Sequence, residues 1–148
     1  MKKTRTIRLR PASWLYLISA MCLAALIFYF SSRAGHQSQS QSDLILKLLH
    51  LPASYSYYVR KGAHFSIYFL MGILGWLFFD SLGFRAGKAL LLTLIFAFLY
   101  AGSDELHQHF VPGRSGQFTD VLLDTLGASA GMLLAMLVHK AWYSLRQK

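Results

Sequence analysis

Long apolar runs separated by charged residues dominate the pattern of this chain. Residues 11–32 and residues 62–79 contain no Asp, Glu, Lys or Arg. Each can cross the ~30 Å hydrocarbon core of a membrane as a helix rising about 1.5 Å per residue. Residues 89–103 and 125–139 are shorter runs and reach span length only if an acidic residue joins the membrane boundary. The pattern predicts an all-α polytopic membrane protein, a single domain over residues 1–148 with four transmembrane helices. We place the spans at about 12–32, 62–80, 86–105 and 120–140.

The segments around the first span allow more than one interpretation. A basic segment before it and Ser32-Arg33-Ala34 after it resemble the layout of a cleaved signal peptide. We favour a span, because the run is long for a signal peptide and three further apolar runs follow. Residues 36–42 (HQSQSQS) predict a solvated loop. Residues 43–51 (DLILKLLHL) are too short to span and predict an interfacial helix that ends at Pro52.

Composition supports the membrane assignment. Hydrophobic residues make up 55% of the 148 residues and charged residues only 14%, against roughly a quarter charged in soluble domains. The formal charge of +9 raises the question of nucleic acid, which basic residues gathered on one folded face would bind. Here the basic residues stand at the ends of apolar runs, as topology signals do. We therefore expect membrane lipids as partners and no nucleic acid.

The basic residues also predict an orientation. Ten of the 15 fall at the amino terminus, between the second and third spans, or at the carboxyl end: Lys2, Lys3, Arg5, Arg8, Arg10, Arg85, Lys88, Lys140, Arg146 and Lys148. By the positive-inside rule this side is cytoplasmic, which places both termini inside. Every acidic residue except Asp80 then falls on or near the outer side. We expect the outer end of the bundle to be its polar end.

A polar stripe begins the second span. The helical period aligns Arg60, His64, Tyr68, Gly72 and Gly75 on one face, and glycines allow close helix approach. We expect this face to pack against protein. The histidine on it is either a packed, hydrogen-bonded interhelical residue or an imidazole that contacts a ligand or transfers protons.

Two adjacent carboxylates end the third span. Asp104 shares a face with Gln108, whereas Glu105 lies about 100° further round and is expected to pair with His109. Adjacent carboxylates at a membrane boundary repel each other, so one is protonated or both require a cation.

The nearby cations are Arg60, Lys61 and Arg114. They either form an ion-pair network that locks the helix ends together, or bind a ligand that carries phosphate or carboxylate. In the second case Arg114 is the strongest single anchor, because a guanidinium binds oxyanions with two hydrogen bonds.

The fourth span carries two carboxylates one turn apart. Asp120 lies in the first turn, where helix capping and the helix dipole explain it. Asp124 lies deeper, where an unpaired carboxylate costs ~2.5 to 3.5 kcal/mol. Gly127 and Gly131 form a GxxxG step that predicts close packing.

No motif predicts a metal or a cofactor. Acidic residues and histidines are suitable metal ligands, yet the chain has no HExxH or CxxC spacing. It also lacks a serine nucleophile motif, a Walker loop and a dinucleotide fingerprint. We therefore expect no metal site and no cofactor.

Three motifs together resemble the VanZ-like family of small bacterial membrane proteins. They are RKxxHFxxYxxM from Arg60, DExHQxFxPGR from Asp104 and DxxxDTxG from Asp120. Phe30-Ser31-Ser32 and residues 38–42 are also similar, so the resemblance runs from about residue 25 to 131. The chain departs from the family at two positions. It has Ile67 where many relatives carry Glu, and Asp124 where Asn is frequent, so a carboxylate role at the first position is excluded and the charge at the second differs.

The resemblance implies a multi-pass protein of the bacterial cytoplasmic membrane. The founding member is associated with low-level resistance to teicoplanin and related lipoglycopeptides. Our first hypothesis is a cell-envelope protein that influences lipoglycopeptide susceptibility through an outward-facing polar site. Its ligand would be a lipid headgroup, a lipid-linked cell-wall precursor or the lipoglycopeptide. We predict these ligand-binding residues: Arg60, Lys61, His64, Tyr68, Asp104, Glu105, Gln108, Arg114, Asp120 and Asp124.

Two alternatives remain. One is an intramembrane enzyme acting on a lipid phosphate or acyl group, with Glu105 or Asp104 as general base and His64 as acid or base. The other is a proton-coupled carrier, although the acidic residues gather at only one end of the spans and mark no path through the membrane. A bundle of this size has a limited interior, and a homodimer is a further expectation.

Overall fold

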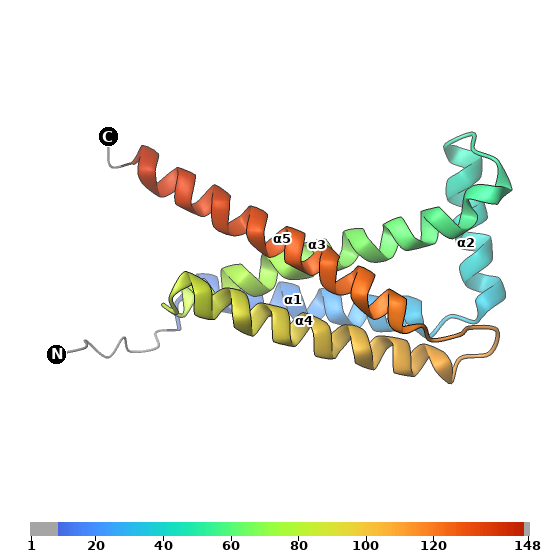
Figure 1. Cartoon of the computed structure of the whole chain (residues 1–148), viewed down its shortest axis with the longest axis horizontal. Helices are drawn as coiled ribbons and strands as arrows, with labels where there is room; N and C mark the ends of the chain where they lie inside the picture. The colour runs from blue at the N-terminus through green and yellow to red at the C-terminus, as the bar shows by residue number, and fades with distance from the viewer. Residues whose placement is uncertain (1–8, 147–148) are drawn as a thin grey trace.

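The protein is a bundle of long helices closed at one end by a short helix (Figure 1). Its structure is a computed structural model that describes residues 9–146. Four of the helical segments are long and apolar enough to cross a membrane, which confirms the predicted all-α fold with four spans. The helices are α1 (Pro11–Ser31), α2 (Gly35–Leu48), the 3-10 helix η1 (Ala53–Tyr55), α3 (Ser56–Ser81), α4 (Ala86–His109) and α5 (Phe118–Leu145).

Three spanning helices extend beyond the predicted spans into polar sequence. α3 begins at Ser56 rather than at residue 62, α4 continues to His109 rather than 105, and α5 covers 118–145 rather than 120–140. Hydropathy marks only the part of a helix that suits hydrocarbon, whereas backbone hydrogen bonding continues through the polar ends. As a result Asp104 and Glu105, which end the predicted third span, lie one turn inside α4, and Gln108 is helical as well.

The segment between α1 and η1 differs most from prediction. Residues 36–42 were predicted as a loop, but they are helical, and the helix begins at Gly35 instead of residue 43. The loop prediction was wrong because serine hydroxyls here bond within the helix: Ser40 and Ser42 donate to the carbonyls four residues earlier, at 3.0 and 3.2 Å. Such bonding does not stabilise a helix by itself, but it satisfies the hydroxyl groups without breaking the backbone hydrogen bonds of the helix. The helix ends at Leu48, just before His50, whose φ is 55°.

The most extensive helix contact joins α3 and α5 through glycines. A Cβ atom on Gly72 would lie 2.0 Å from the Ala128 carbonyl oxygen, and one on Gly131 would lie 1.9 Å from that of Phe69. These backbones approach each other more closely than any side chain would allow. The close packing predicted for the glycines of both helices is confirmed.

The interior is narrow and the outside is apolar. Tyr68, Met71 and Ala128 belong to one buried cluster, and Trp76 and Met132 belong to another nearer the opposite end. Many leucine, isoleucine and phenylalanine side chains are exposed along α1, α4 and α5, and Leu70 is exposed on α3, as expected of surfaces that face lipid.

Figure 1 places the first turn of α1 and the last turn of α5 at one end of the bundle and α2 at the other. Which end faces the cytoplasm stays a prediction, as does the homodimer. Lys2, Lys3, Arg5, Arg8 and Lys148, which support the predicted orientation, lie outside the described residues.

Candidate functional site

The polar residues of three spanning helices meet near the α2 end of the bundle. We call the following four residues the acidic cluster: His64 of α3, Asp104 and Glu105 of α4, and Asp124 of α5. One nitrogen or oxygen atom from each lies within 4.8 Å of those of the others. The exposed fractions are 3% for Asp104, 4% for Glu105 and 0% for Asp124. Three predicted site carboxylates therefore converge in an almost dry interior.

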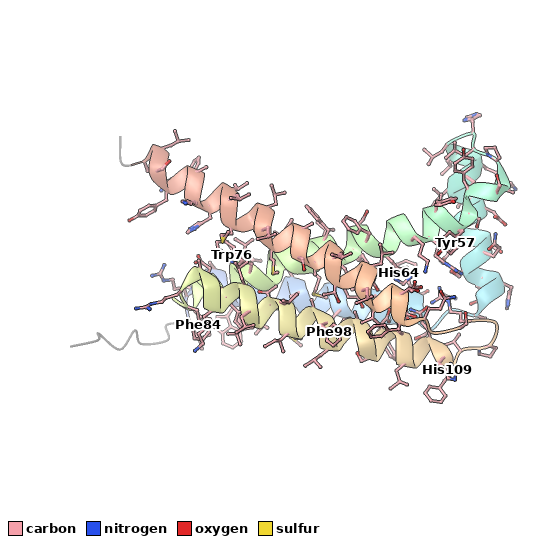
Figure 2. The ribbon with its side chains drawn as sticks, in the orientation of Figure 1. Tyr57, His64, Trp76, Phe84, Phe98 and His109 are labelled. Atoms are coloured by element: carbon pink, nitrogen blue, oxygen red, sulfur yellow. The ribbon has the colours of Figure 1, made fainter. Side chains whose placement is uncertain are left out.

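Hydrogen bonds hold part of the acidic cluster in place. The Gln108 side-chain amide donates to Asp104 Oδ2 and Glu105 Oε1, both at 3.0 Å. The backbone N–H of Gln117 donates to Glu105 Oε2 at 2.9 Å. Glu105 thus pairs with these two glutamines and not with His109, which was the expected partner. His109 is exposed and points away from the bundle at the end of α4 (Figure 2).

The remaining cluster atoms are less well satisfied. His64 Nδ1 lies 3.4 Å from Asp124 Oδ2. Asp104 Oδ1 and Asp124 Oδ1 are buried and have no hydrogen-bond partner among the described residues. The hydroxyl of Tyr68, a side chain with no exposed surface, also lacks a partner there. A buried polar atom without a partner requires an explanation, because its desolvation is not compensated.

Lys61 and Asp120 form a separate ion pair at the edge of the site, with their side chains 14% and 17% exposed. The Lys61 ammonium also lies 5.2 Å from the centre of the Tyr57 ring. Because Lys61 bonds Asp120, it does not compensate the buried carboxylates one turn deeper. This pair fits the predicted network that locks helix ends together, and it lies apart from the acidic cluster.

Arg114 connects the α4–α5 loop to α1 and α2. Its guanidinium donates to the Ser31 carbonyl at 3.1 Å and to Ser38 Oγ at 2.8 Å. Its Nε is buried and unpartnered within the described part of the chain. Burial and the nearby Arg60 guanidinium lower the pKa of Arg114, although an arginine stays protonated in proteins. No ion pair joins Arg60 or Arg114 to a carboxylate within residues 9–146.

The two arginines line a cavity of about 420 Å³ between α1, α2 and α3. We call it the arginine pocket. Its polar lining includes Arg60, His64, Arg114, Ser31 and Ser38, and its apolar lining includes Ile27, Phe30, Leu44, Ile45, Val59 and Ile67. Figure 2 shows His64 on α3, on the side facing α5. His64 therefore belongs both to the acidic cluster and to the wall of the arginine pocket.

The predicted site residues thus divide into three groups. Arg60, His64 and Arg114 line the arginine pocket. Asp104, Glu105, Asp124 and the bonding Gln108 lie behind it, with Tyr68 close to them in the core. Lys61 and Asp120 form the edge pair.

Sequence reasoning missed Ser31, Ser38 and the backbone of Gln117. The resemblance to the VanZ-like family includes Ser31 and residues 38–42, and that similarity was the available signal for the two serines.

A bundle of four helices long and apolar enough to cross a membrane, with ionisable side chains gathered near one end, is the architecture of a polytopic membrane protein. The family model described as VanZ/LLP1 matches residues 14–139. The chain therefore belongs to the VanZ/LLP1 family, in agreement with its resemblance to VanZ-like proteins. No curated protein and no solved structure matches the chain significantly.

Proposed function

We propose that this protein binds a phosphate-bearing lipid headgroup in the arginine pocket, either of a membrane phospholipid or of a lipid-linked cell-wall precursor. The proposal rests on the observation that the two arginines of the pocket have no ion-pair partner among the described residues. Both line one cavity, neither forms an ion pair with a described carboxylate, and Arg114 retains a buried N–H without a partner. A phosphate offers the acceptor oxygens that this arrangement lacks.

The rest of the cavity suits the remainder of a lipid. Ile27, Ile45 and Ile67 contribute apolar surface beside the arginines, so one ligand can place its phosphate on the cations and its chain on the isoleucines. A volume of about 420 Å³ lies in the usual range of ligand pockets, about 300–1,000 Å³. It accommodates a headgroup and the first part of a chain.

The cellular role that we propose is an influence on lipoglycopeptide susceptibility. Family membership supports it, together with the predicted orientation that places the arginine pocket at the outer face of a bacterial cytoplasmic membrane. There a protein that binds a lipid-linked precursor or a headgroup changes access of teicoplanin-type antibiotics to their surface target.

The first experiment measures headgroup binding directly. Purified protein is titrated with short-chain phosphatidylglycerol, undecaprenyl phosphate and, as a lipid without phosphate, short-chain diacylglycerol, and binding is followed by native mass spectrometry. We expect the anionic lipids to bind and Arg114→Ala to lose them by about tenfold or more, the cost of one charge-assisted contact of about 1.5–3 kcal/mol. Arg146→Ala, which removes an exposed arginine at the other end of the bundle, is the matched control. Equal loss in both variants, or no preference for anionic lipids, contradicts the proposal.

The second experiment tests the cellular role. A Gram-positive host expresses the wild-type protein, Arg114→Ala or Arg146→Ala, with membrane levels confirmed for each. We expect the wild type and Arg146→Ala to raise teicoplanin resistance and Arg114→Ala not to. If the wild type is well expressed and has no effect, the proposed role in resistance is wrong for this protein. The proposal of headgroup binding is then judged by the first experiment alone.

An intramembrane enzyme is a second candidate, and the position of His64 favours it. This imidazole faces the arginine pocket and lies 3.4 Å from Asp124 Oδ2, an arrangement that suits a general base. Asp104 and Glu105, the other predicted bases, do not line the pocket. Release of phosphate or of a deacylated lipid from a labelled phospholipid tests the candidate. Product that forms equally with His64→Gln would exclude this histidine as the base.

A further inference from the structure

Among residues 9–146 no lysine or arginine forms an ion pair with the acidic cluster, although the Arg114 guanidinium is near enough to Asp104 and Glu105 to interact with them electrostatically. Three carboxylates and one imidazole lie together in this cluster. Carboxylates this close together and this deeply buried repel one another with little screening. A positively charged ligand among them would relieve that repulsion.

The carboxylate oxygens that lack a hydrogen-bond partner are the evidence for a bound ligand. Gln108 and the Gln117 N–H occupy Asp104 Oδ2 and both oxygens of Glu105. Asp104 Oδ1 and Asp124 Oδ1 are left buried and without a described partner. Carboxylates that bind a metal are commonly oriented in this way, with outer partners on some lone pairs and others left for the ion.

We propose that the acidic cluster binds one divalent first-row transition-metal ion, with zinc or manganese the best matches. A set of one imidazole and three carboxylates suits these metals, whereas all-oxygen sites are typical of magnesium and calcium. The sequence spacing predicted no metal site, because the ligands come from three helices and form no local motif. Only the packing of α3, α4 and α5 brings them together.

The distances fit such an ion. Two ligands of a tetrahedral zinc at about 2.0–2.1 Å lie about 3.3 Å apart. His64 Nδ1 is 3.4 Å from Asp124 Oδ2, so the imidazole and this carboxylate, whose Oδ1 is unpartnered among the described residues, are close enough to share one ion. The ligand atoms of all four residues lie within 4.8 Å of one another, so the widest pairs would have to move closer when an ion binds. The inference does not depend on headgroup binding. His64 contributes to the pocket wall, so a bound ion would adjoin the arginine pocket without filling it.

The test measures metal content and coordination. Full-length protein with a tag that contains no histidine is stripped with a chelator, dialysed separately against Zn²⁺, Mn²⁺ and Co²⁺, and analysed by plasma mass spectrometry. We expect about one ion per chain for the wild type and at least about tenfold less for Asp104→Asn and Asp124→Asn, which keep side-chain shape. Asp80→Asn is the matched control, because Asp80 lies 3.8 Å from His139 at the opposite end of the bundle and should not affect the ion.

A second measurement guards against variants that misfold. Visible absorption of the Co²⁺ protein reports coordination in the intact wild type, and we expect His64→Gln to change the spectrum. Gln108→Ala, which removes an orienting partner and no ligand, should weaken affinity by about 10-fold or more. A wild type that holds none of the three metals overturns the inference, as does metal that persists in both Asp→Asn variants or falls equally in Asp80→Asn.

Discussion

Tyr68 and Tyr100 lie on facing helices with ring centroids 6.3 Å apart, yet their hydroxyl groups are in different environments. The Tyr100 hydroxyl donates to the Ala24 carbonyl at 2.6 Å, whereas the Tyr68 hydroxyl is buried without a described partner. One tyrosine thus ties α4 to α1. The other keeps an unsatisfied donor next to the buried carboxylates.

Replacement of each tyrosine by phenylalanine separates these situations. We expect Tyr100→Phe to lower the free energy of unfolding by about 1 kcal/mol, since a hydrogen bond is lost. Tyr68→Phe should leave stability unchanged or raise it slightly, since it removes only an unsatisfied group. Thermal unfolding in detergent micelles, followed by circular dichroism, measures both. A clear loss of stability in Tyr68→Phe would mean that its hydroxyl has a partner in the folded protein.

At the scale of elements, the contact of α3 with α5 depends on glycines that a single methyl group would disturb. Gly131 approaches the Phe69 carbonyl so closely that an added Cβ atom would lie 1.9 Å from it. Gly102 of α4, in contrast, has nothing within 4 Å of the position of an added Cβ atom. Substitution by alanine therefore adds the same methyl group at a crowded position, Gly131, and at an open one, Gly102.

We predict opposite effects of alanine at these two glycines. Gly131→Ala should destabilise the protein by about 1–3 kcal/mol through overpacking. Gly102→Ala should stabilise it by roughly 0.5–1 kcal/mol, because alanine is the better helix former. The midpoint of thermal unfolding distinguishes the two results. If both variants shift in the same direction, the α3–α5 contact is looser than the structure indicates.

Some of these elements could be predicted from the sequence and others could not. The four spans and the glycine faces were predictable, because hydropathy and helical period are local properties that a membrane reinforces. The helix from Gly35 was not, since residues 36–42 have the composition of a loop and their tertiary partners, among them Arg114 and Ser56, are distant in the sequence. The acidic cluster was partly predictable. Carboxylates at helix ends indicated a site, but Glu105 was assigned the wrong partner because helical spacing does not reveal contacts across a loop.

At the scale of the whole molecule, the orientation in the membrane is the property that decides which compartment supplies the ligand. The structure puts α2 and the last turn of α5 at opposite ends, so one accessible position at each end reports the orientation. Cys22 is the single cysteine, and its replacement leaves a clean background.

We predict that α2 is outside and the carboxyl end inside. In a Cys22→Ser background, Ser40→Cys on α2 should react with a membrane-impermeant maleimide in intact spheroplasts. Ser144→Cys should react only after permeabilisation, since the positive-inside rule places that end in the cytoplasm. Both serines are exposed, which makes them comparable. The reverse labelling pattern would place the arginine pocket at the cytoplasmic face.

The hydrogen bond from Arg114 to Ser38 has a consequence for the order in which the protein assembles during its synthesis. The two residues are 76 positions apart, and chains grow at about 5–20 residues per second. Arg114 is therefore synthesised about 4–15 s after Ser38. In the last part of that interval, once synthesis has passed Ser81, α1 and α3 can already be inserted while α2 lacks its hydrogen bond to Arg114. A nascent chain halted before Arg114 would possess most of the spans but no closed pocket.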